Sequence, residues 1–162
     1  MATKSNVEEL SVVDHITINA PASRVWKVLT LPNFIDQWDD IPDDFGDRPL
    51  QMGSVIEWKG FSRLTVTGFD PERFLKLKLY SPKWEAPPEQ YDIAYSYSLA
   101  ETDGHTKLSL IIGDFGVLPD GETYQDASLE FAEEALPKIK ELAEKMDEKL
   151  WDDTPRPDPL DV

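Results

Sequence analysis

The sequence contains no cysteine and only two histidines among its 162 residues. Without cysteine there is no disulfide framework, no thiol nucleophile and no cysteine-ligated metal. No apolar run approaches the roughly 18 residues that indicate a membrane-spanning helix. The first residues, MATKSNVEELSV, also lack the apolar segment of a secretory signal. We therefore expect a cytoplasmic protein.

Positive charge is scarce as well, because 16 Lys and Arg stand against 32 Asp and Glu, for a formal net charge of −16. Binding to nucleic acid requires clustered Lys and Arg against the phosphates. Anionic membrane surfaces likewise attract basic segments. We therefore expect neither a nucleic acid nor a membrane as a partner. The negative charge is interpreted as a source of solubility, with a basic partner as the alternative.

The length and composition indicate one globular domain, with 40% hydrophobic and 30% charged residues. We place this domain at residues 1–150. The remaining residues, 151–162, carry three prolines at alternate positions and few apolar side chains. They are predicted to form an acidic, proline-rich tail.

Alternating apolar and polar residues predict a first strand at residues 12–19, in which Asp14 shares the apolar face with Val12 and Ile18. The segment NAPASRVWKVLTLPNFIDQW then predicts a helix, a break at Leu31-Pro32, and a second short helix ending at Trp38. Further strands are predicted at 55–59, 63–69, 73–80, 91–99 and 106–112. Short turns between them favour antiparallel pairing.

From about residue 123 to 150 the apolar period becomes helical, with Phe131 and Leu136 inside this segment. Pro137 interrupts it, so the sequence predicts either a kinked helix or two helices. The whole chain is therefore an α+β protein, with about six antiparallel strands curved around one long C-terminal helix. Such a sheet encloses space beneath the helix, and the two short helices would close one end of it.

Three segments carry a family resemblance: ITINAPASRVWKVLTLPNFIDQW, SRLTVTGFDPERFLKLKL and YSYSLAETDGHTKLSL. Their order resembles the START-like, or SRPBCC, helix-grip superfamily. Within it the chain is similar to homologues of the activator of the heat-shock-protein-90 ATPase and to the polyketide-cyclase-like group. The resemblance implies a pocket for a hydrophobic or aromatic small molecule. It carries over no catalytic residue set, and we expect no cofactor.

Candidate cavity residues combine large apolar side chains with a few polar groups, which is typical of ligand pockets. Asp14 on the first strand is a candidate ligand anchor or general base. The others face the expected interior from the short helices, the sheet and the long helix; they are Trp26, Trp38, Trp58, Leu77, Tyr95, Tyr97, Phe131 and Leu136. Buried tyrosine hydroxyls need partners, which a ligand would supply. The alternative for each residue is that it fills the core.

Other polar residues are given no functional role. His15 and His105 have no second histidine nearby in sequence, so both are interpreted as surface residues and no metal site is expected. The acidic loop after Trp38, with Asp39 and Asp40 at its start, does not match a calcium loop. We interpret it as a solvated loop.

Three functions remain open on the sequence. The first is a protein that binds a hydrophobic or aromatic small molecule in an internal cavity. The second is an enzyme of the cyclase, aromatase or hydrolase type that uses the same cavity, and the third is a chaperone-associated interaction domain. No catalytic motif selects the enzyme, and monomer and homodimer are both open.

Overall fold

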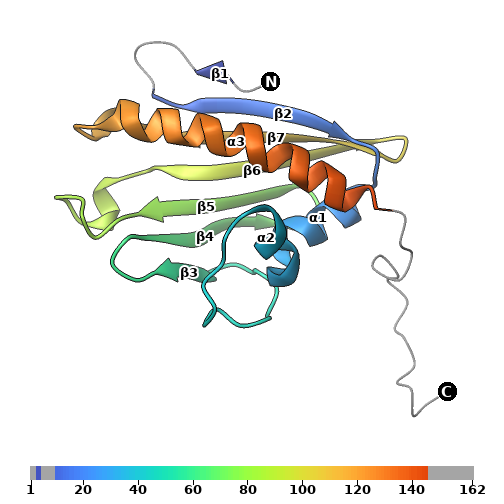
Figure 1. Ribbon diagram of the computed structural model, residues 1–162, viewed down its shortest axis with the longest axis horizontal. Coiled ribbons are helices and arrows are strands. Elements are labelled where there is room, and N and C mark those ends of the chain that lie inside the picture. Colours follow the sequence, from blue (N-terminus) through green and yellow to red (C-terminus); the bar gives the residue numbers. More distant parts are fainter. Residues whose placement is uncertain (1–2, 5–9, 146–162) are drawn as a thin grey trace.

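The computed structural model describes residues 3–4 and 10–145, which form one antiparallel sheet and three α-helices (Figure 1). The sheet has the strand order β1-β2-β7-β6-β5-β4-β3. Its strands are β1 (Thr3–Lys4), β2 (Val12–Ile18), β3 (Val55–Trp58), β4 (Ser62–Asp70), β5 (Phe74–Tyr80), β6 (Ala94–Thr102) and β7 (His105–Gly113). The α+β prediction is confirmed. The seventh strand, beyond the six predicted, is the two-residue β1 at the edge beside β2.

The tight turn between β6 and β7 explains their pairing. Asp103 and Gly104 both have positive φ, at 53° and 80°. Two successive left-handed residues match the right-handed twist of a hairpin, and Asp-Gly is a favoured pair for this turn. The turn therefore sets the register in which Thr102 faces His105.

The two short helices are α1 (Ala22–Thr30) and α2 (Pro32–Trp38). Leu31 between them is extended, with φ −89° and ψ 123°. A residue that precedes proline avoids the helical region, and proline itself is well suited to the first position of a helix. The predicted helix, break and second helix are confirmed.

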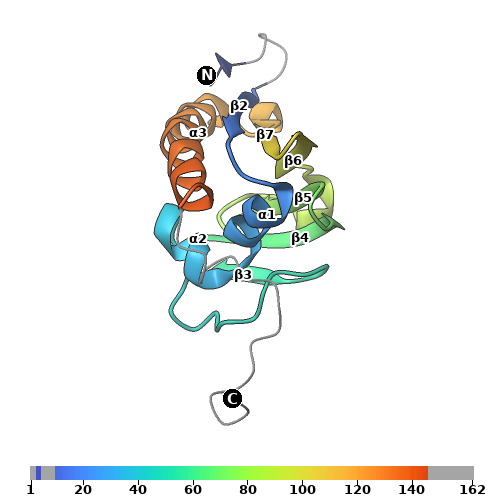
Figure 2. The same cartoon turned by 90° about the vertical axis from the view of Figure 1, so that its right-hand side faces the viewer.

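The long helix α3 (Gly121–Ala143) lies against β2 and is hydrogen-bonded to this strand and to the residue before it, near the two helix ends (Figure 1). The Gln125 side chain donates to the Ser11 carbonyl at 3.0 Å, and Lys140 Nζ donates to the Thr17 carbonyl at 3.0 Å. Glu144 beyond the helix accepts from the Asn19 amide at 2.6 Å. Figure 2 shows that the sheet curves from β2 beside α3 to β3 beside α2. The helix α3 therefore lies over the β2 end of the sheet, whereas α2 lies at the β3 end.

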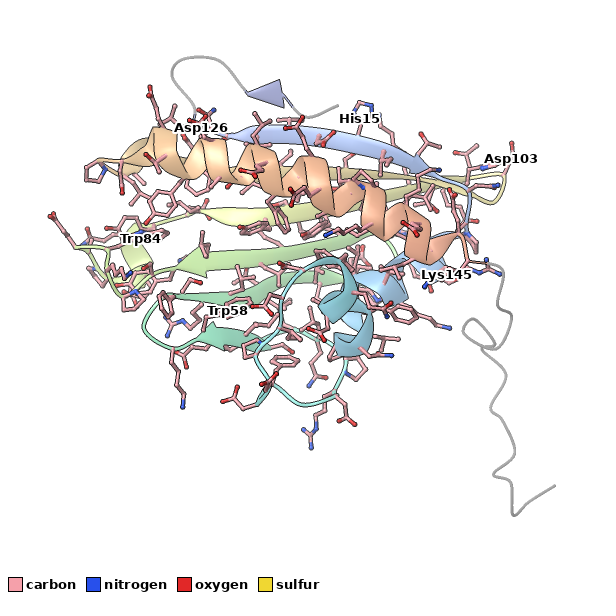
Figure 3. All side chains as sticks on the ribbon, in the orientation of Figure 1. His15, Trp58, Trp84, Asp103, Asp126 and Lys145 are labelled. Atoms are coloured by element: carbon pink, nitrogen blue, oxygen red, sulfur yellow. The ribbon has the colours of Figure 1, made fainter. Side chains whose placement is uncertain are left out.

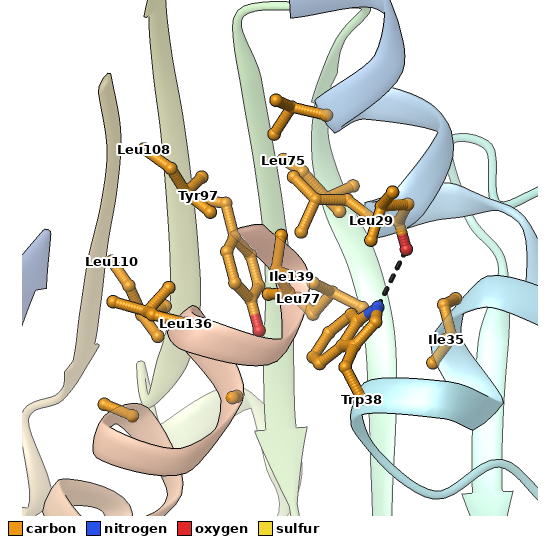
Figure 4. Packing of buried hydrophobic residues seen from close by; sticks show 14 of the residues in the cluster. Leu29, Ile35, Trp38, Leu75, Leu77, Tyr97, Leu108, Leu110, Leu136 and Ile139 are labelled. Carbon is orange, nitrogen blue, oxygen red and sulfur yellow. Dashed lines mark hydrogen bonds between the residues drawn. The ribbon is translucent and has the colours of Figure 1, made fainter. Parts of the chain in front are cut away.

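The core lies where α3 meets the central strands (Figure 4). Leu136 and Ile139 of α3 are buried against Leu108 and Leu110 of β7. Two short 3-10 helices, η1 (Pro88–Gln90) and η2 (Phe115–Val117), complete the described elements. Within the described residues, no helix has the length and apolar character required to cross a membrane.

Pro137 lies inside α3, which runs as one helix through it. The alternative of two separate helices is therefore wrong for the described part of the chain. The helix begins two residues before the predicted start. The predicted end at 150 and the predicted tail at 151–162 lie outside the described residues.

Replacing the exposed Pro137 by alanine is expected to raise the free energy of unfolding by about 2 kcal/mol. Alanine restores an amide donor for the Glu133 carbonyl and has the best helix propensity. Part of the gain is offset because proline also restricts the unfolded chain. Urea denaturation measures the change, with Glu141→Ala on the same helix as the control. A Pro137→Ala variant no more stable than this control would contradict the prediction.

Candidate functional site

A cavity of about 570 Å³ lies between α3, α2 and the strands β3 to β6. Its walls are mostly apolar and aromatic side chains. The lining residues are Leu29, Ile35, Trp38, Asp39, Asp40, Leu50, Ile56, Trp58, Phe61, Ser62, Leu64, Leu75, Leu77, Leu79, Ser81, Lys83, Trp84, Tyr95, Tyr97, Phe115, Tyr124, Ala127, Ser128 and Phe131. The volume falls within the range that small-molecule sites occupy.

The alternation of β5 explains why this strand lines the cavity with leucines. Leu75, Leu77 and Leu79 point toward α3, whereas Lys76 and Lys78 point to the other face of the sheet. Six residues selected from the sequence lie on the cavity wall, namely Trp38, Trp58, Leu77, Tyr95, Tyr97 and Phe131. The structure thus brings together side chains from α2, β3, β5, β6 and α3.

Three selected residues are not among those that line this cavity. Asp14 is buried in β2, the strand that packs against α3. Leu136 is buried on the face of α3 that packs into the core (Figure 4). Trp26 of α1 packs edge-on against Phe69, with ring centroids 5.4 Å apart. Trp38 therefore lines the cavity, whereas Trp26 does not.

Four aromatic rings, which we call the ring cluster, meet on one wall of the cavity: Trp38, Tyr95, Tyr97 and Phe131. The Trp38 ring lies 6.3 Å from Tyr97 and 6.4 Å from Phe131, between centroids. Tyr95 and Phe131 are 5.6 Å apart, with their planes at 89°. Figure 4 shows the Trp38 indole near Tyr97, with its nitrogen donating to the Val28 carbonyl at 2.8 Å.

The Tyr95 and Tyr97 hydroxyls form no hydrogen bond within the described residues, although Tyr97 is only 3% exposed. Burial raises the pKa of both hydroxyls above the usual range, and the charge of Asp39 raises it further. Both groups therefore stay protonated at neutral pH. Two uncharged hydroxyls at a cavity wall can each donate to, or accept from, a bound molecule.

Asp39 was not among the residues selected from the sequence, where it was interpreted as the start of a solvated loop. It follows Trp38 directly, so the end of α2 places it at the cavity together with Asp40. The residue is exposed at its open side, yet the protein around its carboxyl group raises the pKa to about 6 by burial. The Asp40 charge also raises this pKa, whereas the Asp40 amide and Lys138 lower it.

A carboxyl group that titrates near neutral pH beside two tyrosines can hold or release a proton for a bound molecule. Its position next to a buried tryptophan was the available sequence signal. Nothing in the sequence indicated that Asp39 lines the same cavity as Tyr95 and Tyr97, because more than 50 residues separate it from them in the chain.

Exposed lining residues mark the mouth of the cavity: Asp39, Asp40, Phe61, Lys83 and Ala127. Lys83 Nζ lies 5.1 Å from the Phe61 ring centroid. Because α3, the loop after α2 and the loop after β5 all contribute, the mouth lies between elements that are distant in sequence.

Sequence reasoning also missed a second group of aromatic residues on the wall, formed by Trp84, Phe115 and Tyr124. Trp84, labelled in Figure 3, donates its indole N–H to the Tyr124 hydroxyl at 3.1 Å. Phe115 stacks on Tyr124 with centroids 5.6 Å apart. The segment IGDFGVLPDGETY carried no regular period, so it gave no sign of this contact.

Among the described residues, no group of three or more His, Cys, Asp or Glu side chains is placed to hold a metal ion. The polar groups on the cavity wall are tyrosine and serine hydroxyls, with two carboxyl groups and one ammonium group at the mouth.

A family model described as "Activator of Hsp90 ATPase homolog 1-like protein" matches residues 19–144. No curated protein matches the chain. Protein MLL2253 from Mesorhizobium loti has a similar structure, with a TM-score of 0.67 and 20% identity over 85% of this chain and 98% of that one. The Aha1 dimer from Colwellia psychrerythraea has a TM-score of 0.60 and 16% identity, over 83% of this chain and 98% of that one. CalU16 from Micromonospora echinospora has a TM-score of 0.53 and 22% identity, over 83% of each chain.

At these identities the solved structures show the fold, and the family model covers well over half of the chain. The order of strand, two short helices, antiparallel strands and long helix is the same as that anticipated from the three sequence segments. The chain belongs to the family of activator of Hsp90 ATPase homolog 1-like proteins, within the START-like, or SRPBCC, helix-grip group.

Proposed function

We propose that the protein binds a small molecule with an apolar or aromatic body in the cavity between α3 and the sheet. The observation that carries the proposal is the pair of tyrosine hydroxyls without a protein partner, set among mostly apolar lining residues. No fully buried polar atom among the described residues lacks a partner, so these hydroxyls are open to the cavity volume and can bind a molecule there. A ligand with a polar end would satisfy them.

The family supports this proposal, because the fold is one of ligand-binding domains. The size of the cavity suits a molecule of one to a few rings. An enzyme that used the same cavity would find its acid or base in Asp39 rather than in Asp14. No described group resembles an activated nucleophile, so binding is the simpler function for these residues.

The test uses the neutral fluorescent probe N-phenyl-1-naphthylamine. We expect saturable binding at one site per chain and a rise in melting temperature, since a ligand that binds the folded state stabilises it by mass action. At 100 times the dissociation constant this amounts to about 2.7 kcal/mol. Native mass spectrometry of freshly purified protein, compared with its denatured mass, would reveal a ligand retained from the host cell.

A matched pair of variants on β5 locates the probe. Leu79→Trp places a larger side chain in the cavity and is expected to weaken binding at least tenfold, or about 1.4 kcal/mol. Lys78→Trp places the same side chain on the opposite face of the sheet and should leave binding unchanged. A folded Leu79→Trp protein that binds as tightly as the wild type would place the probe elsewhere and contradict the proposal.

A further inference from the structure

The charge and the rings at the cavity define its ligand more closely than apolar character does. We propose that the ring cluster and Asp39 form a site for an organic ammonium ion, so that the bound molecule carries an amine or quaternary ammonium group on an apolar body. This inference rests on the proposed function, because it requires that the cavity binds a small molecule.

The ring cluster is suited to a cation by its geometry. Its three ring contacts have interplanar angles of 71°, 50° and 89°, so the rings meet at steep angles rather than stack. In such contacts the edge of one ring lies against the face of the next, and all four rings also line the cavity, so parts of their surfaces border its volume. The face of an aromatic ring carries negative electrostatic potential and attracts ammonium groups, most strongly for tryptophan.

Asp39 supplies the negative charge. Among the described residues it forms no ion pair, although Lys138 on α3 is near enough to lower its pKa. It lines the same cavity as Tyr95 and Tyr97, and its charge adds to the burial that raises the pKa of both hydroxyls. An ammonium group bound there would meet a carboxylate, hydroxyl oxygens as acceptors and ring faces together.

The other charges at the cavity also favour a cationic ligand. Asp40 adds a second carboxylate, and Lys83 alone is basic among the described lining residues. Lys83 Nζ lies over the Phe61 ring at the mouth rather than in the ring cluster. The net charge of −16 also attracts cations to the protein as a whole. An anionic ligand would face repulsion from Asp39, and a neutral ligand would lack the charge attraction that an ammonium group gains there.

The test compares two probes of nearly equal shape, 2-naphthylmethylamine, which is cationic, and 2-naphthylmethanol, which is neutral. Isothermal titration calorimetry of the full chain at about 0.15 M salt keeps general charge effects screened. We expect the amine to bind at least about tenfold more tightly than the alcohol. Equal or tighter binding of the alcohol would overturn the inference and leave the proposed function intact.

Two isosteric variants separate the local carboxylate from the overall field. Asp39→Asn is expected to remove the tenfold preference for the amine and to change alcohol binding by less than about twofold. Asp36→Asn removes the same charge from an exposed position of α2 that does not line the cavity, and should keep the preference. Equal losses in the two variants would mean that net charge is responsible, which contradicts the inference.

The pH dependence provides a readout that a structural role of Asp39 would not produce. Only the ionised carboxyl group attracts a cation, so amine affinity should be complete above the pKa of about 6 and fall as the pH drops below it. The loss should level off at about tenfold, the same as in Asp39→Asn, while alcohol affinity stays constant. The charged and titratable groups that interact with Asp39 are Asp40, Lys138, Tyr95 and Tyr97, and burial raises the pKa of both tyrosine hydroxyls away from this range.

Failure of the two proposals is distinguishable. If neither naphthyl probe binds while N-phenyl-1-naphthylamine does, the ammonium site is wrong and the cavity function stands. If none of the three binds to the folded wild type, both proposals are overturned.

Discussion

Replacing Trp38 by alanine is expected to lower the free energy of unfolding by about 3–5 kcal/mol, the usual cost of truncating a buried tryptophan. Trp38 is 7% exposed and contacts the rings of Tyr97 and Phe131. Its removal would join the vacated space to an existing cavity, so the surrounding side chains would find little to pack against. Urea denaturation of the variant measures the loss.

The indole nitrogen of Trp38 has its own role, which Trp38→Phe tests. In a continuing helix the Val28 carbonyl would accept from the amide of residue 32, but that residue is Pro32 and has no N–H. Trp38 Nε1 supplies the missing donor at 2.8 Å. Phenylalanine keeps much of the packing and leaves this carbonyl unpaired, at a cost of about 1–3 kcal/mol.

Trp58 provides the comparison for Trp38→Ala, because it also lines the cavity but is only half-buried at the end of edge strand β3. Trp58→Ala should therefore cost clearly less than Trp38→Ala. Equal costs would show that α2 does not depend on the Trp38 anchor, and the account of the helix pair would be wrong.

Gly121→Ala is the second change for which we expect a large loss, at the upper end of the roughly 1–3 kcal/mol that overpacking costs. In an ordinary helix position alanine would be more stable than glycine by about 1 kcal/mol. Here the added Cβ would lie 2.2 Å from the Phe115 carbonyl oxygen and 2.8 Å from the Leu10 side chain. Leu10 can move, but the Phe115 backbone is fixed by a fully buried ring.

The consequence of Gly121→Ala extends to the cavity, because Phe115 stacks on Tyr124 and both line it. We expect weaker N-phenyl-1-naphthylamine binding together with the loss of stability. Gly116→Ala is the control, since its Cβ would meet only the Asp114 side chain, at 3.1 Å, which can shift. A Gly121→Ala protein as stable as this control would contradict the close approach of α3 to η2.

The local sequence predicted most of the fold because each element carries its own signal. Alternation marked β5, where leucines and lysines take turns, and Leu31-Pro32 marked the end of α1. The sequence predicted the structure least well where it has no regular alternation of apolar and polar residues. The segment 112–124 gave no indication of η2 and put the start of α3 two residues late, and the two-residue β1 is too short to form a pattern.

The candidate site was predictable only in part. Large aromatic residues on inward faces pointed to Trp38, Trp58, Tyr95, Tyr97 and Phe131, because side-chain direction follows from strand and helix periodicity. Asp14 met the same rule and lies elsewhere, since β2 is the strand that α3 covers. Periodicity tells which face of the sheet a residue occupies, but not whether a helix or open space lies above it.

The sequence by itself determined the order of the elements, the apolar faces and the family, because these depend on local patterns. Only the tertiary structure placed Asp39, Tyr95 and Tyr97 around one cavity and left the two hydroxyls without a protein partner. The curvature of the sheet away from α3 decides this. It sums many small strand twists and long-range contacts, which no short stretch of residues encodes.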